Sequence, residues 1–494
     1  MNRILQKIIF AASAAALCGC MVGPDFEKPK ANLPEGWNLQ DSGKKLTEAD
    51  TARKLSEKEL VEWWAIFNDP VLTSLVGRAF EGNLDIADAK AVIDQARATL
   101  GMTQSGLFPS LDANADMAEG TNSMAAVEHA SYGMGASASW ELDVFGGTRR
   151  AIESSVEDYR AALADKCAVR IAVAAEVAQN YFLYRAYQQI LVITKSNLET
   201  QKKTYSITLR RKQNGFVSQL DVVRASAAVQ STSSEIPSIE SKMVLARHSL
   251  ELLLGLPAGS LEKELSQPKD LPELENFMPI GVPAKLVERR PDIIVAEHQL
   301  HSAVASIGNA EADLYPKFYV TGNISYEAPS VGSLVQKQYG SWSVGPSATW
   351  SIFQAGKIVY NIDLQKAVSD AAKVSWQKTV LTAFKEVEDA LVSSSKERER
   401  IEFINVLVSD NRKAFELSTR LYAEGEIEFL DLLDTQRSML TSEQNQVESR
   451  RLFVTNIVSL YKALGGGWSP EDMKDSAPEK TRWLFFKNSF NDAD

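Results

Sequence analysis

The sequence predicts an α+β membrane protein that contains an internal duplication, and three observations support this fold class. A basic and then apolar segment at the N-terminus has the form of a secretory signal. Sequence motifs recur 207 or 210 residues apart along the chain. Each repeat combines two segments of alternating polarity with a run of 67 or 68 residues that lacks both Gly and Pro.

The composition excludes several classes of protein. The 494 residues include 53 basic and 64 acidic side chains, three cysteines and four histidines, and the formal net charge is −11. This acidic balance argues against a nucleic-acid binder, and three cysteines are too few for a disulfide-stapled module. With 45% hydrophobic and 24% charged residues, the chain can bury a large core and differs from a disordered chain and from a polytopic helical membrane protein.

The N-terminal signal predicts a compartment and an anchor. Residues 1–19 begin with basic side chains, continue with an apolar stretch too short to span a membrane, and precede Cys20. The segment resembles the lipobox of bacterial lipoproteins, which implies that Cys20 becomes the first mature residue and carries the lipid. Cys18 replaces the small residue usual at its position and is the rival candidate. By the same resemblance, Met21 favours sorting to the outer membrane.

Motif pairs at a constant offset divide the chain into two repeats. The first repeat covers residues 71–282 and the second 283–464, between an N-terminal segment 20–70 and a C-terminal tail 465–494. A series of pairs in constant register indicates duplication rather than chance. The pairs are Asp85-Ile86 and Asp292-Ile293, Phe108-Pro109 and Tyr315-Pro316, Trp140 and Trp350, Gly215 and Gly425, and Leu220-Asp221 and Leu430-Asp431.

Each repeat begins with a helix and contains a very long one. The runs without Gly or Pro, 148–214 and 357–424, would each extend about 100 Å as helices. Their apolar residues recur every three or four positions with polar residues between them, which is typical of helices packed side by side with one wet face. A plain periplasmic coiled coil would show the same pattern.

A shorter helix is expected after each long one. Gly215 and Gly425 end the long helices, and stretches of 39 residues follow them, the first of which contains Pro237 and should be kinked or interrupted there. Each shorter helix covers about half of its long partner. Helices at 71–106 and 284–314 should therefore stack end to end with the shorter helices.

Four segments alternate strictly between apolar and polar residues. Each is about ten residues long, as expected for a membrane-spanning strand with lipid on one side and water on the other. A half-buried soluble sheet would also alternate, but the predicted anchor and the long helices favour the transmembrane strands. The strands are predicted at 110–117, 131–142, 318–326 and 341–352, and the outward-facing loops at 118–130 and 327–340.

Four strands cannot close a barrel. Open strand edges are not tolerated in hydrocarbon, and known barrels start at about eight strands. Copies of the chain must therefore assemble, and two copies would give eight strands while three would give twelve.

Several motifs resemble the TolC-type outer-membrane efflux ducts, specifically their lipoprotein branch. The resemblance implies a homotrimer with a transmembrane barrel of twelve strands and a long periplasmic helical barrel. It also implies an equatorial belt from 20–70, 256–283 and 465–494, a periplasmic adaptor and an inner-membrane pump of the resistance-nodulation-division class. The motifs are the lipobox with Gly23-Pro24-Asp25-Phe26, Trp63-Trp64, Arg289-Arg290-Pro291-Asp292, Tyr315-Pro316, and Gly425 with Leu430-Asp431-Leu432-Leu433-Asp434.

The expected functional site is a periplasmic gate at the end of the helices. Asp431 and Asp434 lie three residues apart after Gly425 and share a helix face, and they match the aspartate constriction of the family. Asp221 holds the equivalent place in the first repeat. Threefold symmetry would turn each residue into a carboxylate ring that attracts cations. Stabilisation of a helix N-terminus is the alternative role for these residues, above all for Asp221.

The chain departs from the family pattern at the residue that would hold the gate closed. Where some members have a basic latch, this chain has Ile427 and Glu428. Arg224, Arg420 and Tyr422 are possible substitutes.

The remaining candidate sites are weak. His298 and His301 could bind a metal, but a solvated helix face is the preferred interpretation because no further ligand cluster is visible. Cys167 lies on an apolar stripe and is predicted to be a core residue. The chain has no phosphate loop, nucleophile elbow or zinc-type cysteine pair, so no enzymatic activity and no cofactor are expected.

Three functions remain open. The first is a passive, gated efflux duct whose substrate is selected by the pump. The second is a lipid-anchored periplasmic scaffold without channel activity. The third is the exit duct of a type I protein secretion system. In each case the outer membrane holds the anchor and the helical part lies in the periplasm.

Overall fold

The computed structural model describes two compact units. The first comprises Met1–Ala31, Ala91–Ala162 and Ile293–Thr379, and the second comprises Asn32–Lys90, Leu163–Asp292 and Val380–Asp494. Within these bounds the described residues are 21–31, 34, 37, 40–41, 44–45, 57–122, 127–273 and 289–474. The predicted lipid site at Cys20 lies outside them.

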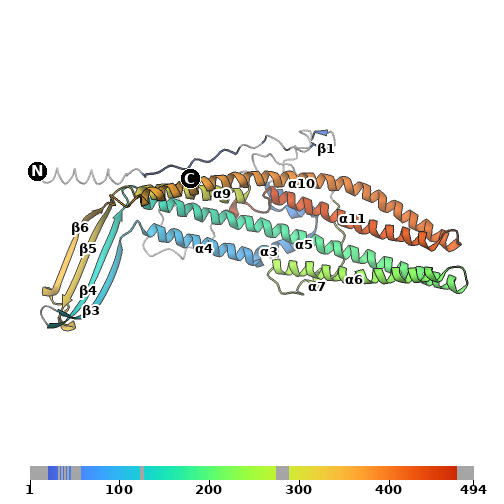
Figure 1. The fold of residues 1–494 in the computed structure, drawn as a ribbon, viewed down its shortest axis with the longest axis horizontal. Helices are drawn as coiled ribbons and strands as arrows, with labels where there is room; N and C mark the ends of the chain where they lie inside the picture. Colours follow the sequence, from blue (N-terminus) through green and yellow to red (C-terminus); the bar gives the residue numbers. More distant parts are fainter. Residues whose placement is uncertain are drawn as a thin grey trace. The chain divides into compact units, whose positions relative to one another are not determined.

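The first unit contains one antiparallel sheet of four strands in the order β3-β4-β5-β6 (Figure 1). Ser110 of β3 lies opposite Ser139 of β4, and Ile324 of β5 lies opposite Trp342 of β6. Among the described residues, β3 and β6 each have one edge that pairs with no further strand. All four predicted strands are confirmed, as β3 (Ser110–Asn122), β4 (Val127–Leu142), β5 (Lys317–Ala328) and β6 (Gly340–Thr349).

The first strand hairpin is longer than predicted. The loop expected at 118–130 is wrong, because the ladder continues to the pair Asn122 and Val127. Polar residues occupy both faces beyond Met117, so the alternation signal ends there while the backbone pairing goes on. The loop expected at 327–340 is confirmed in outline, since it contains only the short helices η2 (Val331–Ser333) and η3 (Lys337–Tyr339).

Two equivalent tryptophans fasten the strands to the turns that precede them. The indole N–H of Trp140 donates to the Leu107 carbonyl at 2.9 Å, and that of Trp350 donates to the Leu314 carbonyl at 3.0 Å. Both indoles remain partly exposed. The bonds recur at matching positions of the two repeats, so the duplication extends to side-chain contacts.

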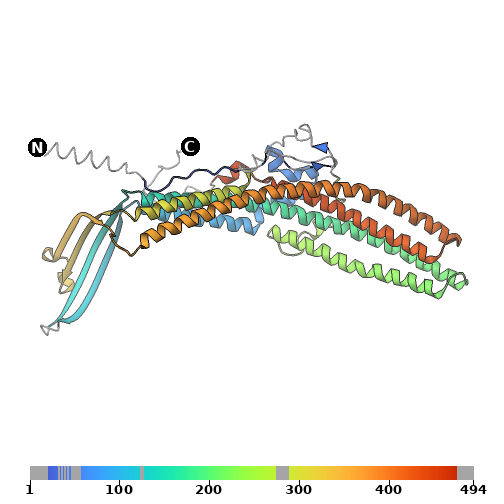
Figure 2. The same cartoon turned by 45° about the horizontal axis from the view of Figure 1, so that its top comes forward.

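The helices follow the predicted order in both repeats (Figures 1 and 2). The long helices have 67 and 68 residues, and each shorter helix has 35. None of the helices in the described ranges is long and apolar enough to cross a membrane. The helices of the repeats are α3 (Pro70–Gly82), α4 (Leu84–Ser105), α5 (Gly147–Gln213), α6 (Gln219–Leu253), α9 (Pro291–Ala312), α10 (Lys357–Glu424) and α11 (Phe429–Ala463).

The interruption expected at Pro237 does not occur. Helix α6 continues through this residue from Gln219 to Leu253. Thr232 and Ile239 are buried on either side of the proline, so packing holds the helix where one backbone hydrogen bond is lost.

The predicted end-to-end stacking is confirmed in the second unit. The Asn83 amide, between α3 and α4, donates to the Leu253 carbonyl at the end of α6 at 2.9 Å. In the second repeat Arg290 donates to the Ala463 carbonyl at the end of α11 at 3.0 Å. At the first junction a Cβ on Gly255 would lie 2.2 Å from the Gly82 carbonyl oxygen, so the backbones touch directly.

The main core of the second unit joins the N-terminal segment to the helices. It includes the segment of α2 (Glu57–Val61) and η1 (Trp63–Phe67), where the ring of Trp63 stacks on Tyr461 with 5.7 Å between centroids. Short elements α7 (Glu262–Leu265) and η4 (Pro470–Met473) belong to the same unit. The prediction for Cys167 is confirmed: the thiol is fully buried, and burial raises its pKa to about 12.

Candidate channel gate

Two helical hairpins of the second unit end in the same kind of turn. Gly215 joins α5 to α6 with φ +79°, and Gly425 joins α10 to α11 with φ +89°. In each turn the residue after the glycine donates to a carbonyl five residues earlier, from Phe216 to Arg211 at 2.9 Å and from Glu426 to Leu421 at 2.9 Å. This helix cap needs a left-handed residue, which glycine adopts without strain.

Asp221 is committed to capping α6. The Ser218 hydroxyl accepts from the Asp221 backbone N–H at 3.2 Å, and the Asp221 carboxylate accepts from the Ser218 N–H at 3.1 Å and from its hydroxyl at 2.7 Å. The arrangement is a reciprocal capping box. Arg224 lies 3.9 Å from the same carboxylate. The alternative structural role of Asp221 is therefore the one that its contacts support.

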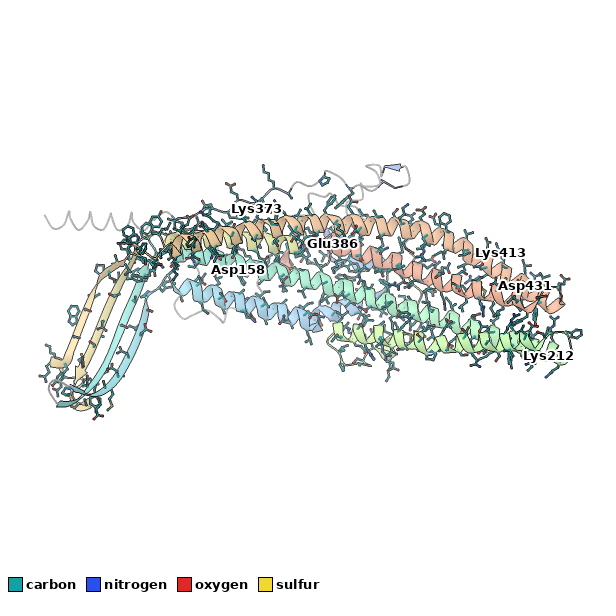
Figure 3. All side chains as sticks on the ribbon, in the orientation of Figure 1. Asp158, Lys212, Lys373, Glu386, Lys413 and Asp431 are labelled. Carbon is teal, nitrogen blue, oxygen red and sulfur yellow. The ribbon has the colours of Figure 1, made fainter. Side chains whose placement is uncertain are left out.

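Asp431 and Asp434 have a different environment. Both are exposed on α11, and within the described part of the chain neither carboxylate has a hydrogen bond or an ion pair. Figure 3 labels Asp431 near the turn that joins α10 to α11. Asp431 lies in the first turn of the helix, where the helix dipole favours a negative charge. Both carboxylates are free to act on solvent ions.

The N-cap residue explains the contrast between the repeats. Asp221 and Asp431 are equivalent third residues of their helices, but the N-cap is Ser218 in the first repeat and Glu428 in the second. Glu428 makes no side-chain capping bond. Asp431 consequently has no partner with which to form a capping box.

A small apolar core lies behind the two turns and joins the hairpins. Its centre is Tyr422, which is 3% exposed and meets Phe429 edge-on with 5.8 Å between centroids. The residues come from α6, α10 and α11, so both hairpins contribute. The buried members are Ala225, Ala228, Tyr422, Phe429, Leu432 and Leu433.

Two residues of α5 bind Tyr422 from the other hairpin. The Thr208 hydroxyl lies 3.1 Å from the Tyr422 hydroxyl, and the Arg211 guanidinium lies over the Tyr422 ring at 4.8 Å. Arg211 also donates to the Tyr422 backbone carbonyl. The sequence prediction named Tyr422 but missed Thr208 and Arg211, although Arg211 belongs to a basic last turn of the kind that helix C-termini favour.

The two other substitutes for the latch lie elsewhere. Arg224 faces Asp221 on its own helix, and Arg420 is exposed on α10. The described contacts therefore place Tyr422 between the hairpins but not Arg224 or Arg420.

The hairpin ends also differ in charge. The last turn of α5 carries Arg210, Arg211 and Lys212, the last of which Figure 3 labels. The corresponding end of the second hairpin carries carboxylates instead. These are Glu424, Glu426, Glu428, Asp431 and Asp434.

The prediction that His298 and His301 lie on a solvated helix face is wrong. Both rings are about three-quarters buried, and their nitrogens lie 2.6 Å from Glu157 and 2.9 Å from Glu153, respectively. The carboxylates belong to α5, about 140 residues earlier in the chain. In the part of the chain that the structure describes, no group of three or more His, Cys, Asp or Glu residues is arranged to hold a metal ion.

Comparisons with known proteins agree with this arrangement. The chain matches the family model described as outer membrane efflux protein over residues 75–256 and 282–466. It is 31% identical over 462 residues to nodulation protein T of Rhizobium leguminosarum bv. trifolii, covering 92% of this chain and 96% of that protein.

Two further proteins are similar along nearly their whole length. The toluene efflux pump outer membrane protein TtgC of Pseudomonas putida is 31% identical over 468 residues, covering 93% of this chain and 95% of that protein. The solved structure of the outer-membrane channel OprN is 33% identical, with a TM-score of 0.80 over 91% of this chain and 100% of that chain. With its duplicated helical hairpins and its four-stranded sheet, the chain belongs to the outer membrane efflux protein family.

Proposed function

We propose that Asp431 and Asp434 form the ion-selecting constriction of an outer-membrane efflux duct. The observation that carries the proposal is the contrast at equivalent positions: Asp221 is bound in a helix cap, whereas Asp431 and Asp434 are exposed without partners among the described residues. The aspartates lie three residues apart on one face of α11, close to the turn at Gly425.

The duct itself follows from the family. The chain is an outer-membrane channel that forms a homotrimer and works with a periplasmic adaptor and an inner-membrane pump. Three sheets of four strands close the membrane barrel, which removes the open edges of β3 and β6. The predictions of fold, function, partners and location in the outer membrane are thereby confirmed.

Threefold symmetry gives the two aspartates their effect. Three copies of each residue would place six carboxylates around one aqueous bore. Such rings attract cations and repel anions, and their mutual repulsion opposes narrowing of the bore. Salt would weaken both effects, because the groups are exposed to solvent.

The contacts of Tyr422 would provide the closing latch that the family's basic residue provides elsewhere. Arg211 and Thr208 hold the second hairpin of a protomer to its first through this tyrosine. Loss of these contacts would free α10 and α11 to move away from α5 without unfolding either hairpin.

We assign the chain no catalytic role, and the energy for transport would come from the inner-membrane pump. Relatives named for efflux pumps favour the efflux duct over a channel-free scaffold and over the exit duct of a type I secretion system. The toluene in one relative's name belongs to that protein, and the substrate here would follow from the pump.

Cys20 is the proposed lipid site. Met21, the next residue, lies against Gly146, where a Cβ would come within 2.7 Å of the Met21 Cγ. Gly146 follows β4, so Met21 lies near the end of that strand. Labelling with palmitate tests this assignment: Cys20→Ser should abolish incorporation and Cys18→Ser should preserve it. The reverse result would move the anchor to Cys18.

Ion selectivity in planar bilayers tests the gate. Asp431→Asn combined with Asp434→Asn should lower the cation-to-anion permeability ratio several-fold at low salt, and less at high salt. Glu416→Gln, an exposed carboxylate on α10, is the matched control and should leave the ratio unchanged. An unchanged ratio in the double variant, in trimers that still conduct, would remove the two aspartates from the constriction.

A further inference from the structure

The segment that follows Cys20 packs closely against other parts of the first unit. The Val22 N–H donates to the Phe145 carbonyl at 3.2 Å. A Cβ on Gly23 would come within 2.3 Å of the Gly308 Cα, and a Cβ on Gly308 within 2.7 Å of the Val22 carbonyl oxygen. Only glycine at both positions allows the segment to lie this close to α9.

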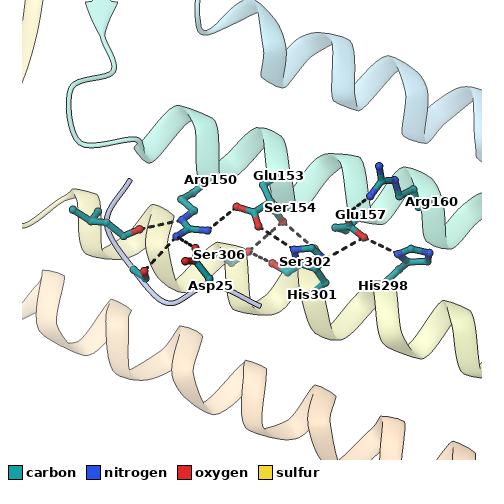
Figure 4. Close-up of polar contacts among 12 residues, drawn as sticks. Asp25, Arg150, Glu153, Ser154, Glu157, Arg160, His298, His301, Ser302 and Ser306 are labelled. Atoms are coloured by element: carbon teal, nitrogen blue, oxygen red, sulfur yellow. Dashed lines mark hydrogen bonds and ion pairs between the residues drawn. The ribbon is translucent and has the colours of Figure 1, made fainter. Parts of the chain in front are cut away.

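Arg150 ties this segment to α5. Its guanidinium is 2% exposed and donates to the Val22 and Gly23 carbonyls at 3.1 and 3.3 Å. It also pairs with Asp25 at 2.8 Å and with Glu153 on its own helix at 2.8 Å (Figure 4). A buried guanidinium of this kind fixes the course of the backbone that it bonds.

His301 holds the same segment from α9. Its ring stacks on Phe26 with 4.3 Å between centroids and 12° between planes. Nε2 of His301 lies 2.9 Å from the Glu153 carboxylate, and Nδ1 lies 3.4 Å from Oε2 of Glu157. The His301 ring therefore contacts Phe26 with its face and two carboxylates of α5 with its nitrogens. Figure 4 shows His301 beside Glu153 and Glu157.

A second histidine shares one of these carboxylates. His298 Nδ1 lies 2.6 Å from the same Oε2 of Glu157, and Arg160 binds the other oxygen at 2.8 Å. The Glu157 side chain is 3% exposed. Burial by itself would raise the pKa of Glu157, but the hydrogen bond from His298 and the nearby His301 and Arg160 lower it overall, so the carboxylate stays charged.

The protonation of His301 decides whether these contacts attract or repel. Carboxylate oxygens face both of its nitrogens, and an ionised carboxylate can only accept hydrogen bonds. A neutral ring carries one proton, so one nitrogen lone pair would face an oxygen lone pair. A doubly protonated ring satisfies both carboxylates.

We propose that Arg150, Glu153, Glu157, His298 and His301 form a proton-dependent clasp that holds segment 21–28 against α5 and α9. The clasp is closed when the histidines are charged and loosens when they lose their protons. Arg150 is always charged, so it keeps a residual hold at high pH. The clasp is independent of the gate and of ion selectivity.

The other charged groups around the clasp do not reverse this sign. Lys28 pairs with Glu297 on α9 at 2.9 Å, and Asp25 and Arg160 pair as described above. Ser154, Ser302 and Ser306 bond one another between α5 and α9 without a charge.

The clasp is an addition to the duplicated scaffold. At the positions in the second repeat that match Arg150, Glu153 and Glu157, the chain has Tyr360, Asp363 and Ala367. At those in the first repeat that match His298 and His301 it has Ala91 and Asp94. The scaffold therefore packs its helices without such a cluster, which leaves the N-terminal segment as the reason for this one.

Spin-label mobility tests the clasp in the mature, detergent-solubilised trimer. Glu27 is exposed, so a nitroxide attached through Glu27→Cys reports the motion of the segment. The label should be immobilised at pH 5.5, and the ratio of mobile to immobile label should rise about tenfold at pH 8, as expected for the loss of one charge-assisted contact. A label at Asp158→Cys, exposed on α5, is the control and should not respond to pH.

Histidine variants separate the proton from the packing. His301→Phe keeps a ring to stack on Phe26 but cannot be charged, and His301→Gln keeps one hydrogen bond; both should remove most of the pH response. His248→Gln on α6 should retain it. An equal mobility of the wild-type label at both pH values would overturn the proposal, as would a full pH response in the combined His298→Gln and His301→Gln variant.

Discussion

The two hairpin ends of the second unit have the same backbone and opposite chemistry. Both turn at a left-handed glycine and both place an aspartate at the third position of the following helix. In the first repeat Ser218 binds that aspartate, and basic residues precede the turn. In the second, Glu428 cannot bind Asp431, and the carboxylate remains free. The two repeats share this backbone, and the N-cap residue decides whether the aspartate is bound in a helix cap or left without a capping partner.

Removing the Tyr422 side chain should uncouple the two hairpins, because residues of both hairpins contact it. Tyr422→Ala should cost about 3–5 kcal/mol of local stability, as for other buried aromatics, and should raise the open probability of the channel in planar bilayers. Tyr422→Phe keeps the core and loses only the hydroxyl bond to Thr208, a cost of about 1 kcal/mol. Equal gating of Tyr422→Ala and wild type would contradict the role of the latch.

Asp69 supplies a buried carboxylate against which the exposed ones can be compared. It caps α3, accepts from the Tyr181 hydroxyl at 2.6 Å and pairs with Lys269 at 3.0 Å. Burial alone would raise the pKa of Asp69, but the bonds from Tyr181, Lys269 and Leu72 lower it overall.

A lowered carboxyl pKa stabilises the fold above the ordinary aspartate value of 3.8, and the contribution is lost as the pH falls through the folded value. Asp69→Asn should therefore cost about 1.5–3 kcal/mol at neutral pH and progressively less in acid. Denaturant unfolding at pH 7 and pH 3 measures the difference. Asp434→Asn, which removes an unpaired exposed group, should show no such loss at either pH.

Removing the N-cap of α6 tests the difference between the bound Asp221 and the unbound Asp431. Ser218→Ala should cost about 1 kcal/mol at the start of α6 and release Asp221. Hydrogen exchange of the first turn of α6 measures this change. Glu428→Ala is the matched control at the equivalent position, where no cap is lost, and it should leave exchange at the start of α11 nearly unchanged. Similar effects of the two substitutions would mean that the capping box contributes little.

Introducing an N-cap serine in the second repeat should change stability least of these substitutions. It should still change the cation selectivity of the channel measurably. Glu428→Ser would let Asp431 enter a capping box, which should stabilise α11 by about 0.5–1 kcal/mol and lower cation selectivity. Glu428→Gln removes the same charge without offering a cap. A loss of selectivity that is equal in both variants would assign the effect to the charge of Glu428 rather than to Asp431.

Periodic patterns in the sequence predicted most of the fold. The runs at 148–214 and 357–424 match α5 and α10 to within one residue, because Gly and Pro bound them. Alternation located all four strands, but it failed beyond Met117, where the backbone pairing continues after the alternating pattern ends. The interruption considered at Pro237 does not occur, and the packing on both sides of the proline that accompanies the continuous helix is not visible in a local pattern.

The contacts of the site residues were harder to predict, because several of their partners are distant in sequence. Spacing and the family resemblance made Asp431 and Asp434 the candidate gate, which stays a prediction. The capping role of Asp221 depends on Ser218, three residues away, and could have been found as a capping-box motif. Arg211 reaches Tyr422 across 211 positions, and His298 meets Glu157 across 141. Such pairs arise only when helices of different repeats are brought side by side.

The stacked junctions at Asn83 and Arg290 set a rule for how this architecture can change in length. In the second unit Asn83 bonds the end of α6 and Arg290 bonds the end of α11, and α6 and α11 both have 35 residues. An insertion in α6 alone would separate the Gly215 and Gly425 turns in height and pull Tyr422 away from Thr208. Matched insertions of whole helical periods in α5, α6, α10 and α11 would instead keep the two turns level and preserve the contact between Tyr422 and Thr208.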